Sequence, residues 1–272
     1  MKKLKLNLDL FDLGVKTHIW FPLPQQISGE PEEWLNPLDF KIVTDNKYNN
    51  RSAYFLTTMT RFKISAVFPL SNNQDDTDNY EIFLQPNSMV QSDHQAIKNI
   101  AKTLTVGETD DSGKSKKCFD WVVGYLEYAN PIRGLYSSLQ ALTDRKVDCG
   151  GFSTLFTSLL RASNIPARCV FGWAVESKYG YHAWVEFFDK KKYSWIPCDP
   201  SVAQLGNRTK LDAGFGFIKD NRVIFSVGED LKLEGDSIEW NVPLLQSPVV
   251  VSFDDDGIPQ KFIEKLTWSY SH

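Results

Sequence analysis

Cys149 has a sequence setting that suits nucleophilic chemistry. It stands in Val147-Asp148-Cys149-Gly150-Gly151, directly before a segment whose apolar residues recur at helical spacing. Asp148 is a good N-cap, so Cys149 falls in the first turn of the predicted helix, where the helix dipole and unpaired N–H groups favour a thiolate and can bind an oxyanion. Glycine costs a helix about 1 kcal/mol relative to alanine, and we interpret Gly150 and Gly151 as leaving the approach to the thiol uncrowded. The apolar positions are Phe152, Leu155, Phe156, Leu159 and Leu160.

A cysteine by itself has a simpler explanation, because thiols are most often buried as small apolar groups. The chain has four, Cys118, Cys149, Cys169 and Cys198, with no C-x-x-C pair among them and only four histidines. This spacing does not predict a zinc site, and disulfides are not expected in a reducing compartment. We therefore expect three of the thiols to be buried packing groups. Cys149 needs a matching base to be more than that.

A hairpin after the helix supplies one. The segment from His182 to Phe188 reads as a strand, the polar run from Asp189 to Lys192 as a four-residue loop, and Tyr193 onward as the returning strand. This register places Phe188 opposite Tyr193 and His182 opposite Asp199, where an imidazole and a carboxylate can hydrogen-bond. One bulge, for instance near Pro197, would turn Asp199 to the wrong face. An ordinary histidine and a turn aspartate before a proline are the alternatives.

The same register fixes the rest of the hairpin. It pairs Glu186 with Trp195, which we interpret as structural, and points Cys198 to the face opposite Asp199.

Composition limits the classes of function. The 272 residues are 42% hydrophobic and 24% charged, with a net charge of −4, as in an ordinary globular protein. Lysine and arginine are spread along the chain, so no nucleic-acid-binding face is expected. Leu4, Leu6, Leu8 and Leu10 alternate with polar residues, which predicts a half-buried strand and not an export signal. No apolar run is long enough to cross a membrane. We expect a cytoplasmic protein.

The chain divides into three regions by pattern. Residues 1–91 are β-rich and residues 92–226 mix helices with strands, whereas residues 227–272 alternate short β-like pieces with acidic turns. The fold class is therefore α+β. Within the first region, Glu81–Leu84 has strand composition. Helices are expected at 94–104 (capped by Ser92-Asp93), 118–128, 135–142 and from Cys149 to Asn164, and strands at 168–174, 182–188, 193–198 and 222–226.

Several short motifs together resemble the transglutaminase-like superfamily, whose core is related to papain-like cysteine proteases. The resemblance covers residues 92–205, with the motifs in the family's order and spacing. It implies a core in which a helix-borne cysteine packs on an antiparallel sheet, and the N-terminal strands look like the β domain of bacterial-type members; residues 227–272 would then be a C-terminal β extension. The motifs are Asp148–Ser153, Leu160–Arg168, Gly172, His182–Glu186, Trp195 and Asp199-Pro200.

The resemblance implies roles for three residues. Cys149 would be the nucleophile, His182 the general base and acid, and Asp199 the group that orients His182. Two positions depart from the family pattern, because Val147 and Asn164 stand where many relatives carry glycine. Neither the calcium-site cluster of animal crosslinking enzymes nor the zinc-binding C-x-x-C pairs of the deglycosylating branch is present. We expect no metal and no cofactor.

Other site residues are candidates only. The Cys149 N–H would supply half of an oxyanion hole, and the second donor would be Trp121, Tyr125 or Tyr128, each of which could equally belong to the core. Substrate-cleft candidates are Gly150, Gly151, Trp173, Tyr179 and Tyr181.

Three functions fit this pattern. The first is a cysteine hydrolase that cleaves an amide of a protein or peptide through a thioester. The second is a transamidase that passes the same acyl group to an amine. The third is a non-catalytic binding module on the same fold. Intact Cys149, His182 and Asp199 argue against the third, and the universal presence of water favours hydrolysis over transamidation. The sequence leaves the oligomeric state open.

Overall fold

The computed structural model of the chain describes residues 3–25, 33–35, 39–69, 79–132, 134–174, 180–205, 214–218 and 222–271. The chain forms two compact units. The first comprises Met1–Gln74, Val223–Ser226 and Leu231–His272, and the second comprises Asp75–Arg222 and Val227–Asp230. No helix among the described residues is both long and apolar enough to span a bilayer.

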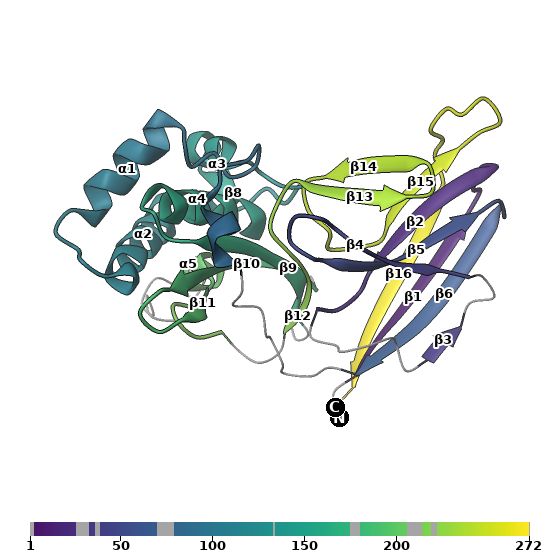
Figure 1. Cartoon of the computed structure of the whole chain (residues 1–272), viewed down its shortest axis with the longest axis horizontal. Helices are drawn as coiled ribbons and strands as arrows, with labels where there is room; N and C mark the ends of the chain where they lie inside the picture. The colour runs from purple at the N-terminus through teal and green to yellow at the C-terminus, as the bar shows by residue number, and fades with distance from the viewer. Residues whose placement is uncertain are drawn as a thin grey trace. The chain divides into compact units, whose positions relative to one another are not determined.

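Two four-stranded antiparallel sheets form the first unit, in the orders β16-β1-β6-β3 and β15-β2-β5-β4, with a β13-β14 hairpin beside them (Figure 1). The two sheets share one apolar core, to which Leu6, Leu8 and Ile64 contribute from one sheet and Ile19 and Phe55 from the other. The strands are β1 (Lys3–Phe11), β2 (Lys16–Pro22), β3 (Glu33–Leu35), β4 (Lys41–Thr44), β5 (Arg51–Thr57), β6 (Arg61–Pro69), β13 (Leu231–Gly235), β14 (Ile238–Val242), β15 (Val249–Phe253) and β16 (Ile263–Ser271).

The alternation of leucines near the N-terminus is seen directly in β1. Leu4, Leu6, Leu8 and Leu10 are fully buried, as the sequence pattern predicts. One edge of β1 pairs with β6, and the other edge pairs with β16, where Leu4 lies opposite Tyr270. The C-terminal strands, which the sequence assigns to a separate extension, therefore lie in the same unit as the N-terminal strands.

The second unit is built around helix α4 (Cys149–Ala162). This helix packs against α1, α2, α3 and α5 and against strands β9 and β10 (Figure 1). The sheet of this unit has the order β11-β10-β9-β12. The remaining elements are η1 (Tyr80–Leu84), α1 (Gln95–Thr105), α2 (Asp111–Tyr125), β7 (Glu127–Tyr128), α3 (Ser138–Asp144), β8 (Lys146–Val147), β9 (Ala167–Ala174), β10 (Tyr181–Asp189), β11 (Ser194–Cys198), α5 (Pro200–Leu205) and β12 (Arg222–Val227).

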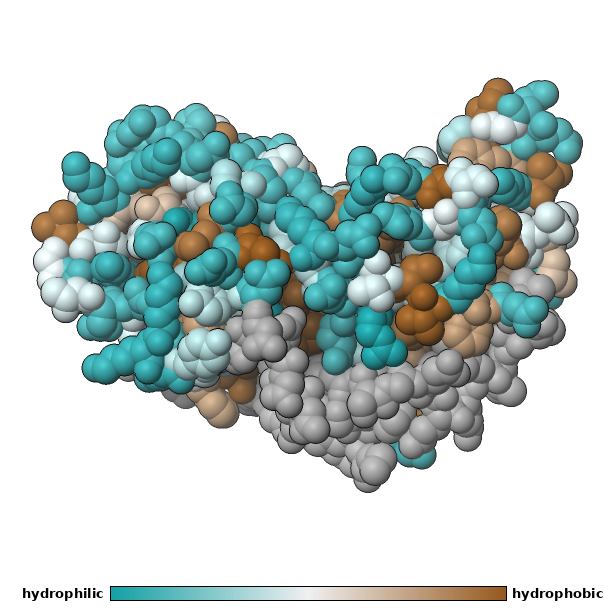
Figure 2. Space-filling view, in the orientation of Figure 1, coloured by the Kyte–Doolittle hydropathy of each residue, from teal (hydrophilic) through white to brown (hydrophobic). Residues whose placement is uncertain are grey.

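Helix α4 is more buried than its apolar stripe predicts, since every residue from Gly150 to Arg161 is buried. Two of its buried hydroxyl side chains donate to backbone carbonyls. Thr154 donates to the Tyr136 carbonyl at 3.0 Å, and Ser158 donates to the Leu155 carbonyl at 2.8 Å. By contrast, α1 buries only Ile97 and Ala101, and hydrophilic side chains cover the surface over α1 and α3 in Figure 2.

Helix boundaries differ from the prediction where capping residues decide them. Helix α2 begins at Asp111 and not at Cys118, because the Asp110 side chain caps it by accepting the Gly113 N–H at 2.8 Å. Helix α3 begins after Ser137, which forms a capping box with Gln140. Helix α1 is capped by His94, so the predicted cap at Ser92-Asp93 is wrong.

The segment from Tyr80 to Leu84 is a 3₁₀ helix and not the predicted strand. Its Tyr80 ring stacks on Phe188, with the ring centroids 4.1 Å apart.

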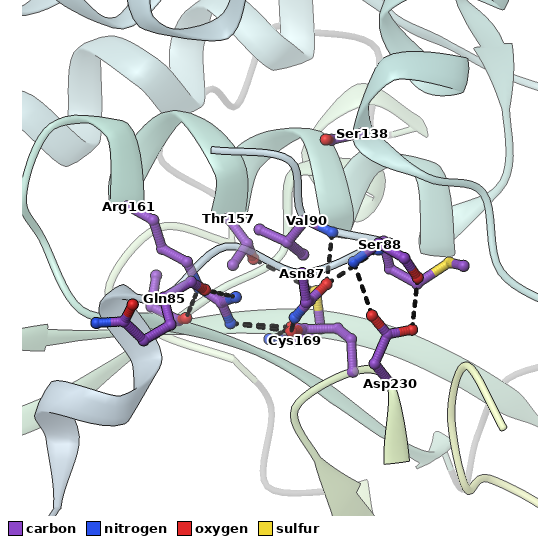
Figure 3. A network of polar contacts seen from close by, with 12 residues as sticks. Gln85, Asn87, Ser88, Val90, Ser138, Thr157, Arg161, Cys169 and Asp230 are labelled. Carbon is purple, nitrogen blue, oxygen red and sulfur yellow. Dashed lines mark hydrogen bonds and ion pairs between the residues drawn. The ribbon is translucent and has the colours of Figure 1, made fainter. Parts of the chain in front are cut away.

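A buried ion pair ties α4 to the sheet and to the turn after β12. Arg161 and Glu229 have fully buried side chains and meet at 2.9 Å. Glu229 also accepts the Cys169 N–H at 3.0 Å and the Asn87 amide at 2.9 Å. Arg161 further donates to the carbonyls of Ala167 and Gln85 (Figure 3). Burial raises the pKa of Glu229, but the Arg161 charge and these N–H groups hold it below its usual value.

Removing one partner of this pair should destabilise the second unit strongly. Glu229→Gln leaves the Arg161 charge buried without a counter-charge, which costs about 3–5 kcal/mol. Urea unfolding followed by tryptophan fluorescence measures the loss. The matched control is Glu127→Gln, because Glu127 and Lys146 form an exposed pair 3.6 Å apart, and such pairs contribute little. Equal unfolding of the two variants would contradict the assignment.

Candidate active site

The N-terminus of α4 presents Cys149 as the sequence predicts. The Asp148 side chain caps the helix, and its Oδ1 accepts the N–H groups of Gly150 and Gly151 at 3.0 and 3.2 Å. Its Oδ2 accepts the Ile132 N–H at 3.1 Å, which ties the loop before α3 to the start of α4. Burial raises the pKa of Asp148, and these N–H groups partly offset that effect. Cys149 is half-buried.

The two glycines after Cys149 are buried and closely packed, and their role in leaving the approach to the thiol uncrowded stays a prediction. A Cβ on Gly150 would lie 2.8 Å from the Leu135 side chain, and a Cβ on Gly151 would lie 2.6 Å from that of Val147. Distances this short do not occur between carbon atoms in contact. The glycines therefore allow the chain before α4 to lie directly against its first turn.

The hairpin of β10 and β11 forms, but its predicted register is wrong by two residues. Phe188 lies opposite Trp195 and not Tyr193, and Glu186 lies opposite Pro197 and not Trp195. The cause is the position of the loop, which begins one residue later than predicted. Asp189 belongs to the strand and pairs with Ser194, and its carboxylate stabilises the turn by accepting the N–H groups of Lys191 and Lys192.

A shift of two residues keeps each side chain on its original face of the strand. For this reason the predicted partnership survives the error. His182 Nε2 lies 2.7 Å from Asp199 Oδ2 even though the two residues are not directly opposed.

The His182 ring connects Asp199 to the thiol. It hydrogen-bonds Asp199 through Nε2 and also hydrogen-bonds the Cys149 side chain, for which Nδ1 is the remaining ring nitrogen. Burial lowers the pKa of His182, but the charge and hydrogen bond of Asp199, together with Cys149, raise it to about 10. The geometry thus favours an imidazolium between a carboxylate and a sulfur atom.

Asp199 is fully buried and receives hydrogen bonds on both oxygens. Oδ1 accepts from the Ser201 hydroxyl at 2.7 Å and the Val202 N–H at 3.0 Å. Oδ2 accepts from His182 and from Arg222 Nη2, each at 2.7 Å. Burial raises the pKa of Asp199, but His182, Arg222 and the Val202 N–H hold it well below its usual range. Asp199 is therefore an anion fixed in orientation.

Sequence reasoning missed two of these partners. Ser201 could have been found, because Asp199-Pro200-Ser201 has the pattern of a helix N-cap followed by proline at the first helical position. Arg222 gave no signal, since it lies in β12, 23 residues from Asp199, and nothing local relates them.

Of the aromatic cleft candidates, Trp173 and Tyr181 are cross-strand partners at the end of the sheet that holds His182. Their rings meet edge to face at 5.0 Å, and both side chains are half-buried. A role as a cleft wall stays a prediction. Tyr179 lies outside the described residues.

Among the oxyanion candidates, Tyr128 is the one that the backbone brings near the thiol. Tyr128 in β7 pairs with Val147, two residues before Cys149. The Tyr125 hydroxyl donates to the Leu142 carbonyl at 2.9 Å, and the Trp121 ring stacks on Tyr125 at 4.4 Å. Tyr128 is therefore the preferred candidate for the second donor.

The other three cysteines are buried, and their thiols are far less acidic than usual. Burial raises the pKa of Cys118 to about 12 and raises those of Cys169 and Cys198 as well. Among the described residues, no group of three or more His, Cys, Asp and Glu side chains is placed to hold a metal ion.

Comparison with known proteins relates part of the chain to a known family. Residues 98–200 match the model of the transglutaminase-like superfamily. This segment belongs to the transglutaminase-like superfamily. The match includes Cys149, His182 and Asp199 and runs from within α1 to the first residue of α5. No curated protein sequence matches the chain.

The chain is also similar to solved structures. The chain is 18% identical to a candidate cysteine protease from Cytophaga hutchinsonii, with a TM-score of 0.61 over 98% of this chain and 90% of that chain. The periplasmic domain of TgpA from Pseudomonas aeruginosa is 15% identical, with a TM-score of 0.40 over 77% of this chain and 92% of its own. The first likeness covers both units of the chain and shows that their fold has been seen in a crystal structure.

Alkylation should single out Cys149. Limiting iodoacetamide at neutral pH is expected to modify Cys149 at least about tenfold faster than the other thiols, because Cys149 is partly exposed at a helix start and hydrogen-bonded to His182, whereas the other three thiols are buried. Peptide mapping by mass spectrometry measures the four rates. Reaction of Cys118 as fast as Cys149 would exclude an activated Cys149.

The His182 charge should contribute to stability in a defined pH range. Its folded-state pKa of about 10 lies above the usual 6.5, so the stabilisation is complete below pH 6.5 and is lost as the pH rises to about 10. We expect the difference in unfolding free energy between the wild type and His182→Gln to shrink across this interval. Urea unfolding at several pH values measures it. A difference that stays constant or grows with pH would contradict the ion pair.

Proposed function

We propose that this chain is a cysteine hydrolase that cleaves an amide bond of a protein or peptide through an acyl-thioester on Cys149. The observation that carries the proposal is the placement of His182 in hydrogen-bond contact with both Cys149 and the buried Asp199. That arrangement holds a nucleophile, a proton carrier and an orienting anion in line.

The first half of the reaction forms the thioester. The Cys149 thiolate attacks the amide carbonyl carbon, and the charge that develops on oxygen is bound by the Cys149 N–H, with Tyr128 as candidate second donor. The His182 imidazolium gives its proton to the amide nitrogen. The carbon–nitrogen bond then breaks, the amine leaves, and Cys149 carries the acyl group while His182 is neutral.

The second half regenerates the enzyme. Neutral His182 takes a proton from water, and the resulting hydroxide attacks the thioester carbonyl. The carbon–sulfur bond breaks, so the products are a carboxylic acid, the Cys149 thiolate and the His182 imidazolium. Asp199 remains an anion throughout and keeps Nε2 protonated, which leaves Nδ1 to carry the transferred proton.

Water as the acceptor is favoured because an amine acceptor would need a binding site of its own. The transglutaminase-like family of residues 98–200 and the fold shared with a candidate cysteine protease support cysteine-based chemistry. A protein or peptide partner and a cytoplasmic location stay predictions from the sequence.

Incubation of the protein with labelled casein and a dansylated amine in one mixture tests the proposal. Release of new N-termini or of ammonia without amine incorporation is the expected result, and His182→Gln should lower the rate by at least about 100-fold because general acid–base catalysis contributes 10²–10⁴. Amine incorporation would instead identify a transamidase.

The matched cysteine variants identify the nucleophile. Cys149→Ala is expected to abolish turnover, whereas Cys118→Ala removes a buried packing thiol and should leave it largely intact. Turnover that persists in Cys149→Ala would reject the proposed mechanism.

A further inference from the structure

Two cationic side chains share one oxygen of Asp199. His182 Nε2 and Arg222 Nη2 each lie 2.7 Å from Asp199 Oδ2. The His182 and Arg222 side chains are only 12% and 10% exposed, so water screens these contacts weakly. Whatever fixes Arg222 therefore acts directly on the carboxylate that orients His182.

The same two side chains also both contact the ring of Trp184. The Arg222 guanidinium lies over the Trp184 ring at 5.0 Å, and the His182 ring stacks on Trp184 with centroids 6.3 Å apart and planes 19° apart. Trp184 is 1% exposed and follows His182 by two residues on β10, so both rings leave the strand on one side. The indole thus holds the imidazole and the guanidinium in fixed positions relative to Asp199.

In the reactive state of the proposed function, the charges of the four active-site side chains cancel. A Cys149 thiolate and Asp199 carry two negative charges, and the His182 imidazolium and Arg222 carry two positive charges. Without Arg222, the buried group would have a net negative charge in that state. Every deprotonation within it would then become harder, because a nearby cation favours the anionic form of an acid and disfavours the protonated form of a base.

From these contacts we infer that Arg222 is a positioning residue of the active site. It fixes the Asp199 carboxylate against His182 and sets the pH range in which the Cys149–His182 ion pair exists. This inference rests on the proposed function, in which that ion pair is the reactive state.

A purely structural salt bridge is the competing explanation, and the same sheet contains a matched example. Arg168 Nη2 lies 2.8 Å from Glu186 Oε2, both side chains are 5% exposed, and the Arg168 guanidinium lies over the Trp195 ring at 4.0 Å. This pair has the chemistry of the Arg222 pair without a contact to Asp199. Arg168→Met therefore measures what losing a buried arginine does by itself.

The experiment is the rate of Cys149 alkylation by iodoacetamide as a function of pH, in the full chain and well below its melting temperature. For Arg222→Met, both limbs of the profile should move to higher pH by about one unit or more, as expected when a nearby cation is lost. For Arg168→Met, the profile should superimpose on the wild type. The inference is overturned if Arg222→Met gives the wild-type profile or if Arg168→Met shifts as far.

Arg222→Lys keeps the test decisive if Arg222→Met does not fold. Lysine retains the charge, so both limbs should stay within about half a unit of the wild type, but it lacks the planar fork that reaches Asp199 while stacking on Trp184. The low-field proton NMR signal of the His182 Nε2–H, identified by its absence in His182→Gln, should therefore move in Arg222→Lys and not in Arg168→Lys. An unmoved signal in Arg222→Lys would reject the positioning role.

Failure of the proposed function is recognised separately. If wild-type Cys149 alkylates with the same pH profile in the folded chain as in urea, no reactive ion pair exists. If the wild type shows the ion pair and the arginine variants match it, only the role of Arg222 fails.

Discussion

The hydrogen-bonded carboxylate of Asp199 is the constraint on which the site depends. It is buried at the junction of β11 and α5 and accepts hydrogen bonds from the side chains of Ser201, His182 and Arg222 and from a backbone N–H of α5. A buried carboxylate without such partners would take up a proton. With them it stays an anion in one orientation, and His182 is held as the group that can exchange a proton with Cys149.

At the start of α4, where the proposed nucleophile Cys149 lies, an unfavourable local sequence is offset by packing. A helix that carries two glycines in its first turn loses local stability. Here the loss is offset by burial, since Leu135 and Val147 pack against the positions where side chains would stand. The helix therefore begins at Cys149, directly after its Asp148 cap, and the half-buried thiol lies at the end of a rigid, buried element, which suits a group that must meet a substrate in one geometry.

Among the described residues of the second unit, three buried arginine–carboxylate pairs occur, and they differ in their consequences. Arg161–Glu229 joins α4 to the turn after β12, and Arg168–Glu186 joins two strands. Arg222–Asp199 resembles them in chemistry, yet its carboxylate also holds a histidine. Under the proposed function, the same kind of ion pair is structural in two places and belongs to the reactive group in the third, because of a single additional neighbour.

What the sequence by itself determined was local or periodic. The N-cap at Asp148, the helix behind Cys149 and the alternation of leucines in β1 follow from contacts between residues close in the chain. The alternation of side chains between the two faces of a strand is also local. For this reason His182 and Asp199 were correctly predicted to meet although the register was wrong by two residues. The tertiary structure alone decided that register, the packing role of Gly150 and Gly151, the pairing of β1 with β16 and the position of Arg222. The β1–β16 pairing and the position of Arg222 depend on which distant segments meet, and that is set by the packing of the whole unit. The hairpin register and the packing of the two glycines depend on the three-dimensional geometry of a turn and of neighbouring side chains, which residue spacing does not encode.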